Sequence, residues 1–293
     1  MRIVFIGAVE FSRRALELLV EMKAEVAGVC TLLESTFNSD HCNLSPYCEA
    51  NGIPWRHTPD VNSPSTLQWI ADRRPDVIFC FGWSKLLRRP LLTLAPLGVV
   101  GFHPAALPAN RGRHPLIWAL VLGLKETAST FFFMDDGADS GDILSQRRIA
   151  IEDVDDVAML YKKMIICALE QIRQFVPQLA AGSFTRLPQD HRNANTWRKR
   201  GRADGQIDWR MSSVSIHNLV RGLTKPYVGA HFMCGGAEIK VWKTELVTDT
   251  PTNVEPGKVL GLTNRGAVVA CGEGGILVLD TQPPFIPAIG DYL

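Results

Sequence analysis

One histidine and one aspartate follow apolar runs of the sequence, at places where the chain would leave buried strands. His103 comes directly after the run 98–102, and Asp139 comes shortly after the run 129–134. A carboxylate beside an imidazole orients the ring and stabilises its charged form, which general acid–base chemistry requires. A histidine that caps a strand and an aspartate that begins a turn would explain the same residue types. The two residues alone leave both interpretations open.

The elements that would position these residues repeat along the first half of the chain, where short apolar runs alternate with helical patterns. The runs predict strands at 3–6, 26–31, 76–81, 98–102 and 129–134. Such alternation is typical of parallel strands joined by crossover helices, so we expect an α/β fold with a Rossmann-like doubly wound parallel sheet. Because ligands of such sheets bind at the carboxyl ends of the strands, the loops after Phe81, Phe102 and Met134 are the expected site.

A different architecture is expected after a long predicted helix at 157–181. A polar, basic stretch follows the helix, and beyond residue 229 short strands alternate with Gly, Pro and Asn, as in small antiparallel sheets and barrels. We expect a catalytic domain at 1–187, a linker at 188–203 and a small antiparallel β (OB-like) domain at 204–293. Five of the eleven residues from 192 to 202 are Lys or Arg, and they would form either a solvated surface or contacts with substrate phosphates.

The composition disfavours several classes of protein. Apolar residues make up 46% and charged residues 21%, as in soluble globular chains. The 31 Lys and Arg residues are balanced by 30 Asp and Glu residues, so bulk attraction to nucleic acid or to an acidic membrane is not expected. A single glycine, Gly7, follows the first predicted strand, whereas a dinucleotide fingerprint needs three. An NAD-dependent dehydrogenase is therefore disfavoured.

The cysteines and histidines show no spacing that would bind a metal. The seven cysteines are scattered, without a Cys-x-x-Cys pair, and are most simply explained as reduced thiols of a cytoplasmic protein. No apolar run near the first residue is long enough for a signal peptide or a membrane span. We therefore expect a soluble cytoplasmic protein with no metal and no membrane partner.

Three short motifs around the two candidate residues can be compared with known families. They are His-x-x-x-Leu-Pro from His103, Arg-Gly-x-x-Pro from Arg111 and Asp-x-Gly-x-Ile-Leu from Asp139. In this combination the chain resembles the formyltransferase family, which includes methionyl-tRNA formyltransferase, glycinamide ribonucleotide formyltransferase and the nucleotide-sugar N-formyltransferases. Residues 81–87 look like the folate-pocket segment of this family. The C-terminal domain that the tRNA and sugar branches share is similar to residues 207–209, 218–223 and 226–230.

The resemblance implies direct acyl transfer from 10-formyltetrahydrofolate to an amine, without a metal. It implies that His103 stabilises the developing oxyanion or relays the amine proton, and that Asp139 positions His103 and helps to accept this proton. It also implies cofactor contacts at Phe81, Gly82, Trp83, Leu86, Asp135, Gly137 and Ala138, and substrate contacts at Asn110, Arg111 and Arg113.

One position departs from the family pattern at the catalytic centre. The family motif carries Asn two residues before the catalytic His, where its amide helps to hold the formyl oxygen, and this chain has Gly101 there. Losing one such donor typically costs about a hundred- to a thousand-fold in rate. The backbone amide of Gly101, a water or another side chain such as that of Asn110 could replace the donor. We favour such compensation because His103, Asp139 and the surrounding loop are intact.

The acceptor is the least determined part of this interpretation. The segment 32–41, where methionyl-tRNA formyltransferases typically carry a longer basic insertion, contains no Lys or Arg, which disfavours nucleic acid as a partner. The motif from Arg111 to Pro115 also looks more like the sugar branch. We expect a dTDP- or UDP-linked amino-deoxy sugar, formylated for a surface polysaccharide such as the O-antigen of lipopolysaccharide.

Two alternatives to a sugar acceptor stay open. They are a methionyl-tRNA formyltransferase, and a formyl-folate-binding relative with weak or hydrolytic activity, which the glycine at 101 suggests. The sequence leaves open the sugar, the position of its amine, the base of its nucleotide and the oligomeric state, a homodimer included.

Overall fold

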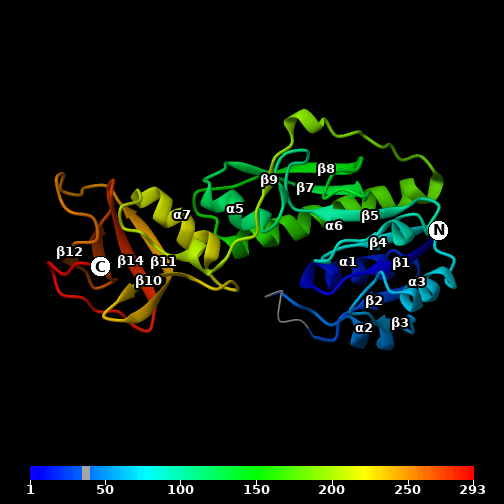
Figure 1. The fold of residues 1–293 in the computed structure, drawn as a ribbon, viewed down its shortest axis with the longest axis horizontal. Coiled ribbons are helices and arrows are strands. Elements are labelled where there is room, and N and C mark those ends of the chain that lie inside the picture. Colours follow the sequence, from blue (N-terminus) through cyan, green and yellow to red (C-terminus); the bar gives the residue numbers. More distant parts are fainter. Residues whose placement is uncertain (35–39) are drawn as a thin grey trace. The chain divides into compact units, whose positions relative to one another are not determined.

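The computed structural model describes residues 1–34 and 40–293, which form two compact units (Figure 1). The first unit consists of residues 1–112, 128–149 and 163–197, and the second of residues 113–127, 150–162 and 198–293. Residues 188–197 of the expected linker lie in the first unit, and residues 198–203 lie in the second. Each unit is therefore assembled from several stretches of the chain.

The first unit is built on a seven-stranded sheet with the order β3-β2-β1-β4-β5-β7-β8. Its strands are β1 (Arg2–Ile6), β2 (Glu25–Thr31), β3 (Trp55–His57), β4 (Val77–Cys80), β5 (Val99–His103), β7 (Glu126–Phe133) and β8 (Ile143–Ala150). Strand β1 pairs in parallel with β2 and β4, and β5 pairs in parallel with β4. All five strands predicted for the first half are confirmed, and the Rossmann-like fold class with them.

The last strands of this sheet depart from the parallel arrangement expected. Strand β7 pairs antiparallel with β5, with Thr130 opposite His103 and Phe133 opposite Val100. The chain therefore enters β7 at the carboxyl end of β5 instead of crossing over the sheet. The physical reason is the connection: residues 113–127 belong to the second unit, so no crossover helix of the first unit joins these two strands.

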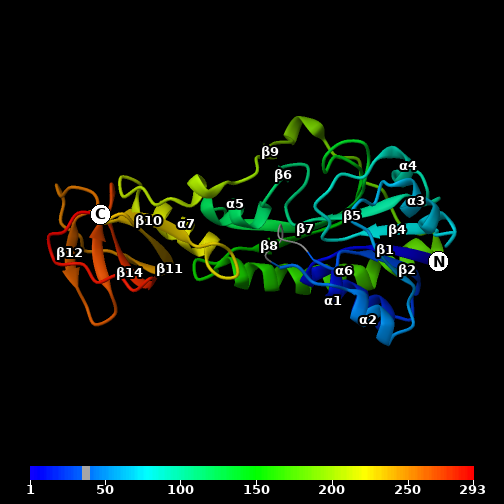
Figure 2. The same ribbon diagram turned by 60° about the horizontal axis from the view of Figure 1, so that its bottom comes forward.

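Helices cover both faces of the sheet, as alternating side chains of its strands require. On one face, Phe5, Phe79 and Phe81 pack with Phe11 of helix α1 (Glu10–Glu21) and Phe175 of helix α6 (Val157–Ala181). On the other face, Val4, Ile6 and Ile78 share a core with Ile70 of α3 (Pro64–Ala71) and Leu91 of α4 (Arg89–Leu92). Figure 2 shows α1 and α6 on the same face of the sheet. The remaining elements of this unit are α2 (Ser45–Ala50), β6 (Arg111–Gly112), β9 (Thr196–Trp197) and a 3-10 turn at His191–Asn193.

The second unit has an antiparallel sheet of its own, as expected from the short strands after residue 229. Its order is β10-β11-β14-β13-β12, formed by Ala230–Cys234, Ala237–Val247, Gly275–Gln282, Ala267–Ala270 and Val259–Leu262. Helices α5 (Pro115–Val121) and α7 (Ser213–Leu223) complete it, with a 3-10 turn at Arg202–Gly205. The two helices approach closely at Gly222, where a Cβ would lie 3.2 Å from Cγ2 of Val121. No helix among the described residues has the length and apolar character that crossing a membrane demands.

Candidate active site

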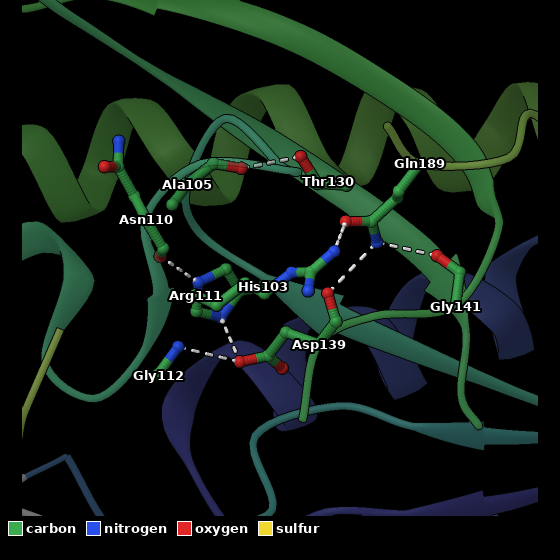
Figure 3. A network of polar contacts seen from close by, with 9 residues as sticks. All are labelled: His103, Ala105, Asn110, Arg111, Gly112, Thr130, Asp139, Gly141 and Gln189. Atoms are coloured by element: carbon green, nitrogen blue, oxygen red, sulfur yellow. Dashed lines mark hydrogen bonds and ion pairs between the residues drawn. The ribbon is translucent and has the colours of Figure 1, made fainter. Parts of the chain in front are cut away.

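His103 and Asp139 lie side by side in the first unit (Figure 3). His103 is the last residue of β5 and is 5% exposed. Its Nδ1 is 3.6 Å from Oδ2 of Asp139, whose side chain is 22% exposed. A nearly buried imidazole next to a carboxylate that solvent can reach has the arrangement of a general acid–base pair. The two residues that the sequence singled out are therefore brought together.

The route by which Asp139 reaches His103 differs from the expected one. Because β7 is antiparallel to β5, its carboxyl end lies beside the amino end of β5, and the amide of Met134 donates to the carbonyl of Val99 (2.8 Å). The loop after Met134 must then return toward His103. We expected His103 and Asp139 to meet because their loops would leave the same edge of a parallel sheet. In the structure they meet because the loop after Met134 turns back toward His103.

The second ring nitrogen of His103 is also next to an oxygen. Its Nε2 is 2.7 Å from the carbonyl oxygen of Asn110, a residue with a φ of +65°. Both neighbours, the carbonyl and the Asp139 carboxylate, are acceptors. Only an imidazole that carries both protons can donate to both of them. The imidazole ring is thus flanked by an oxygen atom near each of its nitrogens.

Asp139 is fixed in place by donors to both its side chain and its backbone. Its Oδ2 accepts from the amide of Gly112 (3.0 Å), and its carbonyl oxygen accepts from Nε2 of Gln189 (3.0 Å). Its φ of +54° is a left-handed conformation that the surrounding contacts must maintain. Earlier in the same loop, Oδ1 of Asp135 accepts from Ser140 (2.6 Å) and from the amide of Gly137 (3.1 Å). The carboxylate is therefore held at a defined position.

Arg111 contacts protein groups beside this pair. Its Nη2 donates to Oε1 of Gln189 (2.6 Å) and is 3.0 Å from Nδ1 of His191, while its buried Nε has no hydrogen-bond partner among the described residues. The sequence predicted Arg111 as a substrate contact and did not single out Gln189. A lone glutamine in a polar stretch carries no pattern that could have revealed it.

The Asn110 side chain and the Gly101 backbone amide were two expected replacements for the missing oxyanion donor, and neither is directed at His103. Figure 3 shows the side-chain amide of Asn110 pointing away from the His103 ring, which it contacts only through its main-chain carbonyl. Gly101 lies inside β5 opposite Cys80 of β4 and Phe132 of β7, so its backbone groups serve the sheet. A Cβ at Gly101 would lie 2.8 Å from Cγ of Met134. Neither of these two proposed replacements for the missing donor faces His103.

The predicted cofactor residues divide into a pocket and a core. Leu86, Asp135 and Gly137 line a surface pocket of the first unit together with Met134, Lys85, Leu87, Arg88, Arg89, Asp60, Asn62 and Asp136. Leu86 is 73% exposed there, and such an apolar surface suits a planar ring. Ala138 is exposed but is not part of the lining.

The remaining predicted cofactor residues do not line this pocket. The Phe81 side chain is fully buried among other phenylalanines, and its carbonyl accepts from Oγ of Ser12 (2.6 Å). Gly82 has a φ of +71°, and a Cβ there would lie 2.1 Å from Cγ2 of Val9, so this turn requires glycine. Trp83 packs against the core. Cofactor contact by Phe81 stays a prediction, and its side chain, which turns into the core, is not part of the pocket lining.

Arg113 belongs to the second unit, where cations gather around Trp118. The guanidinium of buried Arg200 is 4.5 Å from the centre of the Trp118 ring, and the indole N–H donates to the carbonyl of Arg198 (3.0 Å). Burial, and then the charges of Arg113, Arg200 and Lys199, lower the pKa of His114. The basic stretch is thus partly folded into this unit. Among the described residues no group of three or more His, Cys, Asp or Glu could hold a metal.

Comparisons with known proteins agree with the geometry. Residues 1–172 match the family model described as formyl transferase, and residues 200–285 match the one described as formyl transferase, C-terminal domain. A methionyl-tRNA formyltransferase of Acetivibrio thermocellus is 32% identical over 286 residues, which cover 96% of this chain and 92% of that protein.

Three solved structures share the fold at 15–17% sequence identity. The sugar 3N-formyl transferase WlaRD, solved with dTDP and 5-N-formyl-THF, has a TM-score of 0.73 over 97% of this chain and 99% of its own. The N-formyltransferase of Helicobacter canadensis, in complex with folinic acid and dTDP-3-aminofucose, has a TM-score of 0.70 over 94% and 98%. HypX of Aquifex aeolicus with tetrahydrofolic acid has a TM-score of 0.68 over 95% of this chain, which spans only 43% of HypX.

Proposed function

The chain belongs to the formyl transferase family and is a formyl-transferring enzyme, and on this premise we propose that it formylates the amine of a nucleotide-linked amino sugar. The donor would be 10-formyltetrahydrofolate, which supplies an activated formyl carbon. The observation that carries acyl transfer is the buried His103 with Nδ1 3.6 Å from Asp139. The choice of acceptor depends on the charges discussed below.

The chemistry assigns a proton task to each member of the pair. The neutral amine attacks the formyl carbon, the new C–N bond forms, and the bond from that carbon to N10 of the folate breaks. His103 takes the proton that the amine loses or stabilises the negative charge on the formyl oxygen, and Asp139 stabilises the charged ring. The proton finally passes to N10 of the departing folate. The products are an N-formyl sugar and tetrahydrofolate, so atoms and charges balance.

The pocket between segments 85–89 and 134–137 is proposed to hold the folate. It combines the exposed apolar Leu86 with Met134, whose side chain also lies against Gly101. It therefore approaches the strand that ends at His103. Related structures with folates bound support a folate at this family's site, and the residues present here fit one.

A compact anionic acceptor fits the distribution of cations better than a nucleic acid does. An acceptor stem needs Lys and Arg spread over a wide surface, because each phosphate contact adds to the binding. The segment 32–41 offers none, and its residues 35–39 lie outside the described part. A nucleotide diphosphate needs only a few cations at one place, and the sequence offers Arg111 and Arg113 next to the motif of His103.

Methionyl-tRNA is the second candidate acceptor. The observation that favours it is the 32% identity to a methionyl-tRNA formyltransferase over nearly the whole length of both chains. The two acceptors differ in their expected salt dependence, because binding of a tRNA backbone with many phosphates weakens more steeply with ionic strength than binding of one diphosphate.

The test is a comparison of acceptors with the purified full chain. With 10-formyltetrahydrofolate as donor, kcat/KM is measured for dTDP- and UDP-linked amino sugars and for methionyl-tRNA. We expect turnover of a nucleotide sugar, and dTDP or UDP should raise the melting temperature because a ligand of the native state stabilises it. Formylation of methionyl-tRNA alone would replace the sugar proposal with the second candidate.

A further inference from the structure

We infer that Gln189 is a positioning residue of the formyl-transfer site, bracing the loop of Asp139 against the segment of Gly112. The side chain is 7% exposed and makes hydrogen bonds with three residues (Figure 3). Its Nε2 donates to the carbonyl oxygens of Asp139 (3.0 Å) and Gly141 (2.7 Å), and its Oε1 accepts from Nη2 of Arg111 (2.6 Å). None of these hydrogen bonds involves His103 itself.

The first contact fixes the loop that must return to His103. Asp139 has a left-handed backbone, and two residues later the loop turns so tightly that a Cβ at Gly141 would lie 1.8 Å from the carbonyl oxygen of Phe133. Two carbonyls in such a loop need a donor. Gln189 supplies both bonds from one amide, so the direction of the Asp139 carboxylate depends on it.

The second contact fixes the other support of Asp139. Arg111 precedes Gly112, whose amide holds Oδ2 of Asp139 at 3.0 Å. The same segment is held by Asn195, which accepts from the amide of Asn110 (2.6 Å) and, through its carbonyl, from the amide of Arg111 (3.0 Å). Both supports of the catalytic carboxylate therefore converge on residues 189–195, which the sequence indicated as a linker.

The inference rests on the formyl-transfer activity and is tested by the change Gln189→Ala. We expect kcat to fall roughly ten- to a hundred-fold, as displacements of about 1 Å in a catalytic group do. The KM for the folate should stay within about threefold, because none of the residues that Gln189 contacts lines the proposed folate pocket. A kcat equal to that of the wild type would overturn the inference.

The change Gln171→Ala is the matched control. Gln171 is also buried, and its Nε2 donates to the carbonyl of Ser129 (3.2 Å) and to Oγ of Ser145 (2.8 Å), away from the Asp139 loop. It should lower the melting temperature but leave kcat per folded molecule unchanged. If both variants lose kcat alike, Gln189 has only a structural role.

The variant Gln189→Glu separates the two arms of the brace. A carboxylate keeps an acceptor for Arg111 but directs an oxygen at the carbonyls of Asp139 and Gly141. We expect at least the kcat loss of Gln189→Ala. Wild-type kcat in Gln189→Glu would show that donation to the Asp139 loop is not required and would contradict the inference.

A readout without turnover separates failure of this inference from failure of the proposed acceptor. With ¹⁵N-labelled histidine, the ring signal of His103, assigned by its loss in His103→Asn, reports the contact of Nδ1 with Asp139. Gln189→Ala should shift this signal, and Gln171→Ala should not. If no nucleotide sugar is turned over but the signal shifts, only the acceptor is wrong. An unmoved signal would reject the positioning role whatever the acceptor.

Discussion

At the residue scale, the site consists of side chains whose partners are spread over the sequence. His103 and Asp139 could be found from the sequence because each stands in a motif beside an apolar run. Gln189 could not, because its role comes from contacts with residues 48 to 78 positions away. The direction of the Phe81 ring could not be predicted either, because a strand-end phenylalanine next to a turn glycine does not show which way its ring points. A hydrophobic pattern in the sequence indicates which side chains are buried, but not which residues they contact.

Replacing either member of the proposed catalytic pair should affect the chemical step. We expect His103→Asn and Asp139→Asn to cut kcat roughly a hundred-fold or more, the scale of a lost acid–base group. Nucleotide binding should be almost unchanged, because both residues act on charge that develops during attack. Steady-state kinetics and nucleotide titration check this, with the exposed His57→Asn as a control. Wild-type turnover in either variant would mean that the wrong residues are named.

Replacing Gly101 with the asparagine of the family motif should destabilise the protein. We expect Gly101→Asn to lower stability by about 1–3 kcal/mol, a typical cost of overpacking, because its Cβ would meet Met134 at 2.8 Å and Phe132 at 3.2 Å. Turnover should not rise. Adding Met134→Ala should restore part of the lost stability in thermal unfolding. A single variant with higher turnover and wild-type stability would instead indicate a weakened oxyanion site.

At the element scale, the strands were predictable and one strand direction was not. Five strands of the first unit follow from apolar runs, since buried strands must be apolar on both faces. The antiparallel β7 is set by where residues 113–127 pack, which a local pattern does not record. Among helices, α7 is joined to β11 by a contact between Nδ1 of His217 and Oγ1 of Thr244 (3.1 Å).

The burial of His217 makes the second unit sensitive to acid. Burial, and then the charge of Arg221, lower the pKa of His217. The unfolded chain then binds a proton more readily than the folded one, so stability is lost as the pH falls below the unfolded value of about 6.5. We expect the melting temperature of the wild type to drop more between about pH 7.5 and 5.5 than that of His217→Gln. Equal drops would show that His217 does not contribute.

At the scale of the whole molecule, the chain interleaves its two units. Residues 113–127 and 150–162 join the second unit although strands of the first unit lie between them in sequence. The sequence pattern suggests a single domain boundary, at residues 188–203. This boundary stays a prediction. The long helix α6 (Val157–Ala181) contributes residues to both units. Its helical sequence pattern is continuous and therefore does not indicate where one unit ends and the other begins.

The fate of the formyl carbon tests the central claim most directly. The wild-type chain is given 10-formyltetrahydrofolate labelled with ¹³C in its formyl group, together with a dTDP- or UDP-linked amino sugar, and the label is followed by NMR. We predict that the label arrives in an N-formyl group on the sugar, and that it does so far more slowly with His103→Asn. Label that arrives only in formate would contradict the account, as would label transferred only when methionyl-tRNA is supplied.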